Sequence, residues 1–297
     1  MPYQIAALLA AASWACSSLV AAEPVRRIGG TRWCRIRMLW VCGMLVLWAT
    51  LRNSWSSLES NDLGLLTLSG IIGIFIGDTA LFVSMARIGP RRTSVLFATN
   101  TPIAAIGGVL LFNEAFTAWS FFGAVLAVVG IMLAINFGSG QVNPSDVYEH
   151  IDGRLIIGSA WAIIGAIGQA LGILAAKPVL DGGADTIAVA ATRVILATIV
   201  MWLLARPTDL LSDSFPKEAI QQSDHWRFAI SALLAMVVGM TLLLYALDNG
   251  DTGIAAILSG TTPVVILPLL WMKTRQAPKR GAWLGAGLTV VGTALLI

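Results

Sequence analysis

Long apolar segments alternate with short polar ones along the whole chain, and ten of these segments are apolar enough to be helices within a bilayer. Most of them have about the 20 residues that a helix needs to cross the hydrocarbon core. The second is short, so we expect the stems of Arg35, Arg37 and Arg52 to carry it to the interfaces. The pattern predicts an all-α membrane protein with ten transmembrane helices, at 3–22, 38–51, 63–86, 93–112, 117–137, 155–176, 186–205, 228–247, 253–272 and 282–297.

Composition agrees with this interpretation, because the 297 residues are 57% hydrophobic and only 12% charged. An ordinary soluble domain carries roughly 25% charged residues, so a soluble enzyme or a disordered chain is excluded. The net charge of +3 gives no reason to expect a nucleic-acid partner. Cys16, Cys34 and Cys42 lack the spacing of metal ligands, and we therefore expect no metal, no cofactor and no disulfide framework.

Basic residues are distributed unevenly among the loops between the ten predicted spans. Sixteen of the 19 Lys and Arg residues fall in the odd-numbered loops, whereas the even-numbered loops hold only Arg52 and Lys177. Short loops rich in Lys and Arg stay in the cytoplasm. The count predicts a multi-pass protein of the cell membrane, inner or plasma, with both termini extracytoplasmic.

Matching residues recur at a nearly constant interval, which indicates an internal duplication. The segment 18–25 resembles 172–179, which lies 154 residues later, and Thr101-Pro102 recurs as Thr262-Pro263, 161 residues later. We expect two five-helix repeats, 1–137 and 155–297, joined by a loop at 138–154. Because five is odd, the second repeat is inverted, and inverted repeats are typical of secondary transporters with a binding site near the bilayer midplane.

Several of these residues resemble the EamA-type signature of the drug/metabolite transporter superfamily: 77–82, 87–92, Thr101-Pro102, 112–117, Gly123 and Gly130 in the first copy, and 245–247, Gly250, Thr262-Pro263, Gly285 and Gly292 in the second. The resemblance implies export of amino acids, other metabolites or drugs. It also implies cytoplasmic termini, opposite to the charge count, and we follow the count. Glu114 occupies the position of the family's acidic residue, and we expect it to fix a turn.

Two charged residues lie well inside the predicted spans, Asp78 and Arg193. Ionisable groups at such depth are expensive and usually face a cavity or each other. Asp78 is a candidate protonation site or ligand for a substrate amine, and Arg193 is a candidate ligand for a carboxylate or phosphate. The alternatives are a structural ion pair between the two, or an Asp78 that is hydrogen-bonded to the helix backbone after Gly77.

Proline interrupts two equivalent spans, at Pro102 and Pro263, and should kink both helices. Paired interrupted spans indicate a transporter binding site, with Asn100, Thr101 and Thr262 beside the kinks. Alternatively, the threonines only satisfy backbone groups that proline frees. Further candidates for the cavity, or else for packing and the interfacial belts, are Trp14, Trp161, Gln169 and Tyr245.

These observations predict a secondary transporter that moves a small metabolite or drug by alternating access, most simply as an exporter, with Asp78 carrying the proton if transport is proton-coupled. A passive small-molecule channel stays open as the alternative. An intramembrane aspartyl protease would need a second intramembrane aspartate, which the sequence lacks, so we expect no enzyme. The expected partners are a small-molecule substrate and the lipid bilayer, with the protein as a monomer or homodimer.

Overall fold

The computed structural model describes residues 1–112, 118–136, 151–152, 154–205, 218–275 and 280–295, and within them the chain is helical without strands. Glu114 lies outside these residues. The helices are α1 (Tyr3–Ile28), α2 (Gly30–Leu51), η1 (Ser54–Ser57), α3 (Asp62–Ser69), η2 (Gly70–Asp78), α4 (Thr79–Phe97), α5 (Asn100–Phe112), α6 (Ala118–Asn136), α7 (Leu155–Asp181), α8 (Thr186–Leu203), α10 (Gln222–Ala232), η3 (Leu233–Met240), α11 (Thr241–Asp248), α12 (Thr252–Ser259), α13 (Thr262–Thr274) and α14 (Arg280–Ala294).

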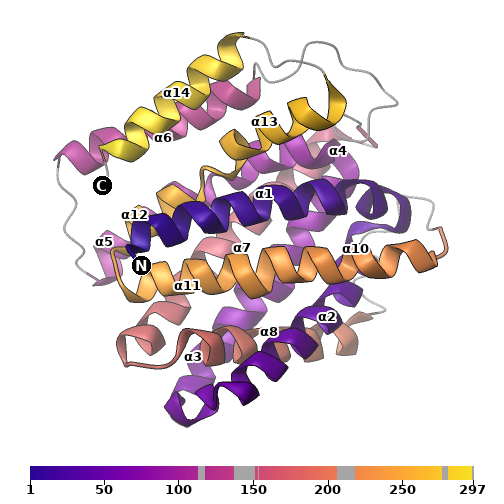
Figure 1. Ribbon diagram of the computed structural model, residues 1–297, viewed down its shortest axis with the longest axis vertical. Coiled ribbons are helices and arrows are strands. Elements are labelled where there is room, and N and C mark those ends of the chain that lie inside the picture. Colours follow the sequence, from indigo (N-terminus) through magenta and orange to yellow (C-terminus); the bar gives the residue numbers. More distant parts are fainter. Residues whose placement is uncertain (113–117, 137–150, 153, 206–217, 276–279, 296–297) are drawn as a thin grey trace.

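Seven helical runs in the described residues are long and apolar enough to cross a membrane. Together they make the chain a multi-pass membrane protein: Tyr3–Ile28, Gly30–Leu51, Asp62–Pro90, Leu155–Asp181, Thr186–Leu203, Gln222–Asp248 and Thr252–Leu269. The helices pack into one bundle, in which α1 begins and α14 ends at the same end (Figure 1).

The second membrane helix begins earlier than its apolar segment suggests. Gly29 separates α1 from α2 with φ 92°, a left-handed conformation that glycine adopts without a steric penalty. Helix α2 starts at Gly30, so Arg37 lies two turns inside it rather than at an interface. The prediction that this span starts at 38 is wrong, because the residues before it bury Trp33 and Cys34 in the core instead of facing water.

Two membrane helices contain π-helical segments at corresponding places in the predicted third and eighth spans. The run from α3 to α4 passes through η2, which ends at Asp78, and the run from α10 to α11 passes through η3, which ends at Met240. A π-turn replaces the i→i+4 hydrogen bond with an i→i+5 bond and is frequent at functional sites. Both segments therefore mark places where the helix departs from regular geometry close to the centre of the bundle.

Two further helices are broken rather than kinked at the repeated Thr-Pro pairs. Helix α4 ends at Phe97 and α5 begins at Asn100, while α12 ends at Ser259 and α13 begins at Thr262. Pro102 and Pro263 lie in the first turns of α5 and α13, where a missing backbone N–H costs nothing. The expectation of a kink inside a continuous helix is wrong, because proline here starts a new helix.

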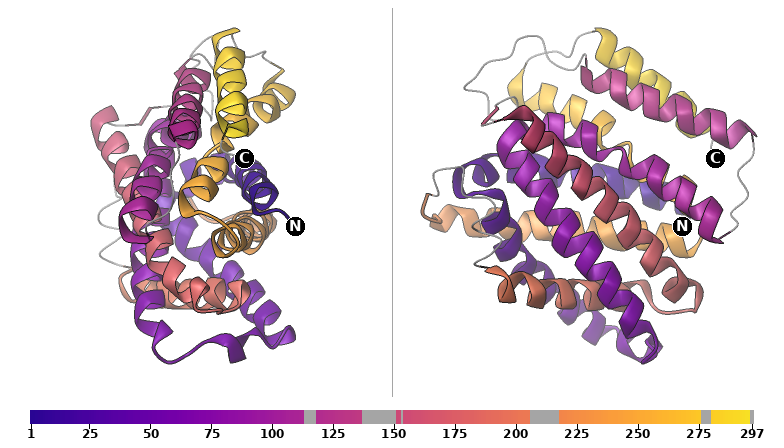
Figure 2. Two further views of the ribbon diagram at one scale, coloured as in Figure 1. Left: turned by 90° about the vertical axis from the view of Figure 1, so that its left-hand side faces the viewer. Right: turned by 180° about the vertical axis from the view of Figure 1, so that it is seen from behind.

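Small residues allow close helix contacts, as their spacing indicates. Helices α6 and α14 lie side by side (Figures 1 and 2), and a Cβ added to Gly130 would lie 2.4 Å from the backbone nitrogen of Thr289. Near the centre, a Cβ added to Gly172 of α7 would lie 2.5 Å from the Cα of Gly73 in η2. The backbones of α7 and η2 are therefore in direct contact, and this contact fixes the position of Asp78.

Candidate functional site

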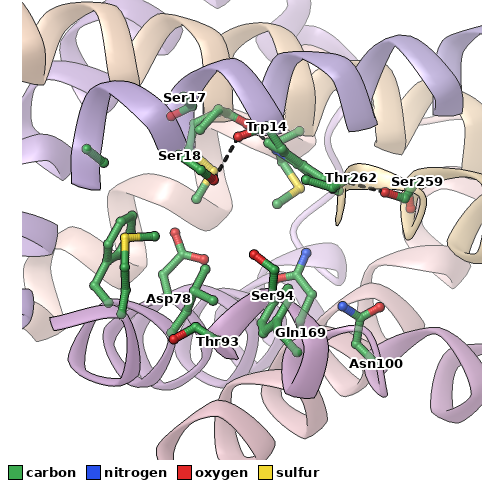
Figure 3. A pocket seen from close by; sticks show the side chains of 18 of the residues that line it. Trp14, Ser17, Ser18, Asp78, Thr93, Ser94, Asn100, Gln169, Ser259 and Thr262 are labelled. Carbon is green, nitrogen blue, oxygen red and sulfur yellow. Dashed lines mark hydrogen bonds between the residues drawn. The ribbon is translucent and has the colours of Figure 1, made fainter. Parts of the chain in front are cut away.

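A cavity of about 110 Å³ lies in the centre of the bundle, which is room for several water molecules. Side chains from both halves of the chain line it. Figure 3 shows Trp14 and Ser18 of α1 on one side, facing Asp78, Ser94 and Gln169 on the other. The breaks between α4 and α5 and between α12 and α13 close the cavity with polar residues, because Asn100, Ser259, Gly260 and Thr262 all line it.

An ion pair between Arg37 and Asp78 forms part of the cavity wall. Nη2 of Arg37 donates to Oδ2 of Asp78 over 2.7 Å, and the arginine side chain is 2% exposed. The guanidinium also lies over the ring of Phe82, 4.6 Å from its centroid. The alternative of a structural ion pair between Asp78 and Arg193 is therefore wrong, because Asp78 pairs with Arg37. Arg37, which the sequence pattern placed at the membrane interface, is the partner because α2 begins seven residues before it.

Arg193 lies behind the cavity wall rather than on it. The residue belongs to α8 and is fully buried, and its Nη1 is 3.7 Å from the sulfur of Met240. Its Nε and Nη2 have no hydrogen-bond partner among the described residues. A Cβ added to Gly73 would lie 3.2 Å from Nη2, so this guanidinium packs tightly against the glycine of η2.

Polar groups of α1 donate hydrogen bonds to backbone carbonyls of the π-segment η3. Trp14 donates from Nε1 to the carbonyl oxygen of Ala235 over 2.7 Å, and Ser13 donates to that of Leu234 over 2.6 Å. A Cβ added to Gly239 would lie 2.6 Å from the Trp14 nitrogen. These contacts fasten α1, from the start of the chain, to a helix from its second half on one side of the cavity.

The structure brings together five of the eleven candidate residues around the cavity: Trp14, Asp78, Asn100, Gln169 and Thr262. The side chains of Pro102 and Pro263 lie outside the described residues. Thr101 is fully buried beside the cavity, where it donates to the carbonyl oxygen of Ala256 over 3.4 Å. Trp161 lies on α7 away from the cavity lining.

Tyr245 is also absent from the cavity lining. Its hydroxyl donates to the carbonyl oxygen of Met1 over 3.0 Å, at the end of the bundle where α1 begins. The expectation that it contacts substrate in the central cavity therefore has no geometric support. Tyr245 instead connects the first residue of the chain to α11.

Several residues of the site escaped the sequence-based reasoning, above all Arg37, Ser18 and Met240. One signal for Arg37 was present, since adjacent glycines at 29 and 30 mark a helix boundary from which it lies two turns away. Ser18 and Met240 carry no comparable signal, because serine and methionine are ordinary residues of membrane helices.

Ion pairs join α1 to later parts of the chain at the end opposite to Tyr245. Arg227 of α10 donates to Glu23 of α1 over 2.6 Å, and Arg27 of α1 pairs with the buried Asp224 of α10. These contacts lie at one end of the cavity-forming helices. They hold α1 and α10 together there in the described conformation.

Comparison with known proteins places these features in a family. The model of the EamA-like transporter family matches residues 1–136 and 156–297. The chain is 29% identical over 103 residues to a protein from Danio rerio, "Solute carrier family 35 member B1", which covers 33% of this chain and 30% of that relative. A solved structure titled "Crystal structure of protein" shares the fold, with a TM-score of 0.74, 15% identity and coverage of 99% of this chain and 96% of that one. Since the family model matches nearly the whole sequence, the chain belongs to the EamA-like transporter family.

Proposed function

We propose that the protein is a secondary transporter that exports a small metabolite or drug from the cell through the central cavity, by alternating access. The observation that supports this most is the cavity itself. It lies between helices of both halves of the chain, beside two helix breaks and the π-segment that ends at Asp78. Ligand sites in transporters lie at such interruptions, because unwound backbone and helix ends there present polar groups to the substrate. The bilayer and the substrate are its partners, and it works without enzymatic chemistry, as a monomer or homodimer.

The proposed architecture has ten spans arranged as two inverted five-helix repeats, 1–137 and 155–297. Support comes from the two separate stretches that the family model matches. The π-segments η2 and η3 and the two helix breaks also occur once in each half. Helix α1 begins and α14 ends at one end of the bundle, as an even number of crossings requires (Figure 1). From the charge count, both termini face out of the cytoplasm.

Alternating access needs one end of the cavity to open while the other closes. We propose that the ion pairs of Glu23 with Arg227 and of Arg27 with Asp224 hold one end shut in this conformation. Their separation, together with rotation about the α4–α5 and α12–α13 breaks, would expose the cavity to that side. The contact between Tyr245 and Met1 would hold the opposite end.

If transport is proton-coupled, Asp78 is the residue in the cavity that carries the proton. It is the only carboxylate among the described residues that line the cavity. While Arg37 donates to it, the carboxylate is held in its charged form. Movement of α2 relative to η2 would break the pair, and the desolvated carboxylate would then bind a proton. In each transport cycle, Asp78 would thus bind one proton when its ion pair with Arg37 breaks.

The test is flux into proteoliposomes under an imposed proton gradient, with amino acids, purines and cationic drugs as the test solutes. Uphill accumulation of a solute, abolished when the gradient is collapsed, supports secondary transport. Equilibration without accumulation shows a passive channel instead. Asp78→Asn should remove accumulation, whereas the matched control Asp62→Asn, at a partly exposed site in the first turn of α3 and outside the cavity lining, should retain it. Normal accumulation in Asp78→Asn would contradict the proton role.

A further inference from the structure

The charges around the cavity do not balance. Arg37 and Arg193 each carry a positive charge, and both are buried. Among the described residues, Asp78 is the carboxylate that pairs with Arg37 and that interacts electrostatically with Arg193. Arg37 already occupies Oδ2 of Asp78 at 2.7 Å. One buried guanidinium charge is therefore left without a counter-charge, and an isolated buried charge costs several kcal/mol unless something pairs with it.

Arg193 is the group with unused hydrogen-bonding capacity. Its Nε and Nη2 lack partners in the part of the chain that the structure describes, and its Nη1 faces only the sulfur of Met240. A thioether is a weak acceptor, so it leaves most of the donor strength of the guanidinium unsatisfied. Arginine is also suited to carboxylates and phosphates, because its planar fork of donors matches two oxygens at once.

Met240 separates this guanidinium from the cavity. The Met240 side chain lines the cavity and at the same time lies 3.7 Å from Nη1 of Arg193, so its far side faces the arginine. Methionine is unbranched with three rotatable bonds, and its side chain moves more readily than that of any β-branched residue. Met240 is the last residue of the π-helical segment η3, where the helix departs from regular geometry.

We propose that the cavity binds a substrate with a carboxylate or phosphate group, and that this group pairs with Arg193 once the Met240 side chain rotates aside. The inference rests on the proposed transport function and adds the charge of the substrate to it. The rest of the molecule would lie against Trp14 and Phe82, with the amides of Asn100 and Gln169 within the same cavity. A substrate amine has less to gain, because the carboxylate of Asp78 is already neutralised by Arg37.

The experiment uses the full chain in phosphatidylcholine nanodiscs and a matched pair of probes, 3-phenylpropionate and its neutral isostere 3-phenylpropionamide. Binding is measured by calorimetry and by thermal stabilisation. A charge-assisted pair with arginine should give the acid a preference of about tenfold to a hundredfold over the amide. Arg193→Gln should abolish that preference, and Arg193→Lys should keep part of it. Arg52→Gln, at an exposed site after α2, is the matched control and should leave the preference unchanged.

Three results would overturn the inference: equal binding of acid and amide, an unchanged preference in Arg193→Gln, or no binding of either probe. Met240→Ala keeps the proposal testable even if Arg193→Gln fails to fold, because uncovering the arginine should tighten binding of 3-phenylpropionate; weaker binding would refute the role of Met240. A lipid headgroup carries the same anionic chemistry. If phosphatidylglycerol in the nanodisc displaces 3-phenylpropionate competitively, the site belongs to lipid and the assignment to substrate is overturned.

The binding and flux experiments distinguish failure of the anion site from failure of the proposed transport function. Uphill flux of neutral or cationic solutes by a protein that does not prefer the acid would leave transport standing and refute the anion site. Binding of the acid that depends on Arg193, without uphill flux of any solute, would support the site and refute secondary transport.

Discussion

Removing Asp78 should destabilise the protein more than removing its partner Arg37. Arg37→Gln leaves the carboxylate of Asp78 with Arg193, which interacts with it electrostatically. Asp78→Asn removes the carboxylate that interacts with both Arg37, in the cavity wall, and Arg193, buried behind it. The two substitutions break one hydrogen bond, at 2.7 Å, but leave different residual charges. The charge balance of the site therefore predicts that Asp78→Asn is less stable than Arg37→Gln, and not only that both variants are less stable than the unsubstituted protein.

The magnitude follows from the geometry. Delocalised charges centred about 4 Å apart attract by about 4 kcal/mol at an effective dielectric constant of about 20. Breaking a buried pair by removing one partner costs about 3–5 kcal/mol, because the other charge stays buried without compensation. We expect Arg37→Gln to fall near the lower end of that range and Asp78→Asn near the upper end. The double variant should lose less than the sum by about 2–3 kcal/mol, since neither partner is then left alone.

The assay is unfolding of the detergent-solubilised protein by titration with sodium dodecyl sulfate, followed by tryptophan fluorescence. Arg227→Gln is the matched control, because it removes an arginine from an ion pair whose carboxylate, Glu23, is 56% exposed, and it should cost at most about 1 kcal/mol. Equal losses for Asp78→Asn and Arg37→Gln, or losses that simply add in the double variant, would refute the account of the charges.

Three further predictions concern packing, topology and the cavity. Gly130→Leu should lower the melting temperature and the yield of folded protein, because its side chain would collide with the backbone of Thr289, whereas Gly43→Leu should not, since nothing lies within 4 Å of a Cβ there. A green fluorescent protein fused after Ile297 should stay dark, because the sixteen-to-two charge bias predicts that this end lies outside the cytoplasm; bright cells would show a cytoplasmic C-terminus. Gln169→Leu should reduce uphill flux by up to about tenfold at unchanged expression, because a substrate in the cavity would lose a hydrogen-bonding partner; wild-type flux would argue that this amide only packs.

Hydropathy predicted a helical multi-pass membrane protein, because lipid removes most alternatives to a long apolar helix. The pattern misled where a helix is partly polar. The first turns of α2 carry three arginines, at 32, 35 and 37, which look like a loop in sequence. They belong to a helix because Trp33 and Cys34 on the same turns are fully buried, and because Arg37 finds Asp78 within hydrogen-bond distance. A tertiary partner of this kind leaves no trace in local hydropathy.

The candidate site was predictable in part for the same reason. Charge inside a span singled out Asp78 and Arg193, and the Thr-Pro pairs singled out Asn100 and Thr262, all of which lie at or directly behind the cavity. Which residues pair with which depends on how α2 and α8 are rotated about their own axes. The spacing of residues in the sequence does not fix that rotation. The three-dimensional structure was therefore needed to show that Arg37, and not Arg193, pairs with Asp78.

The central claim is that molecules cross the membrane through this cavity, and covalent blockage of the cavity tests it most directly. Ser18 lines the cavity from α1 (Figure 3), whereas Ser56 in η1 is exposed at the surface. With Cys16, Cys34 and Cys42 replaced by serine, Ser18→Cys and Ser56→Cys are each modified by a methanethiosulfonate reagent, and labelling is verified by mass spectrometry. The account predicts that labelling stops proteoliposome flux in Ser18→Cys and leaves it intact in Ser56→Cys. Full flux through fully labelled Ser18→Cys protein would contradict it.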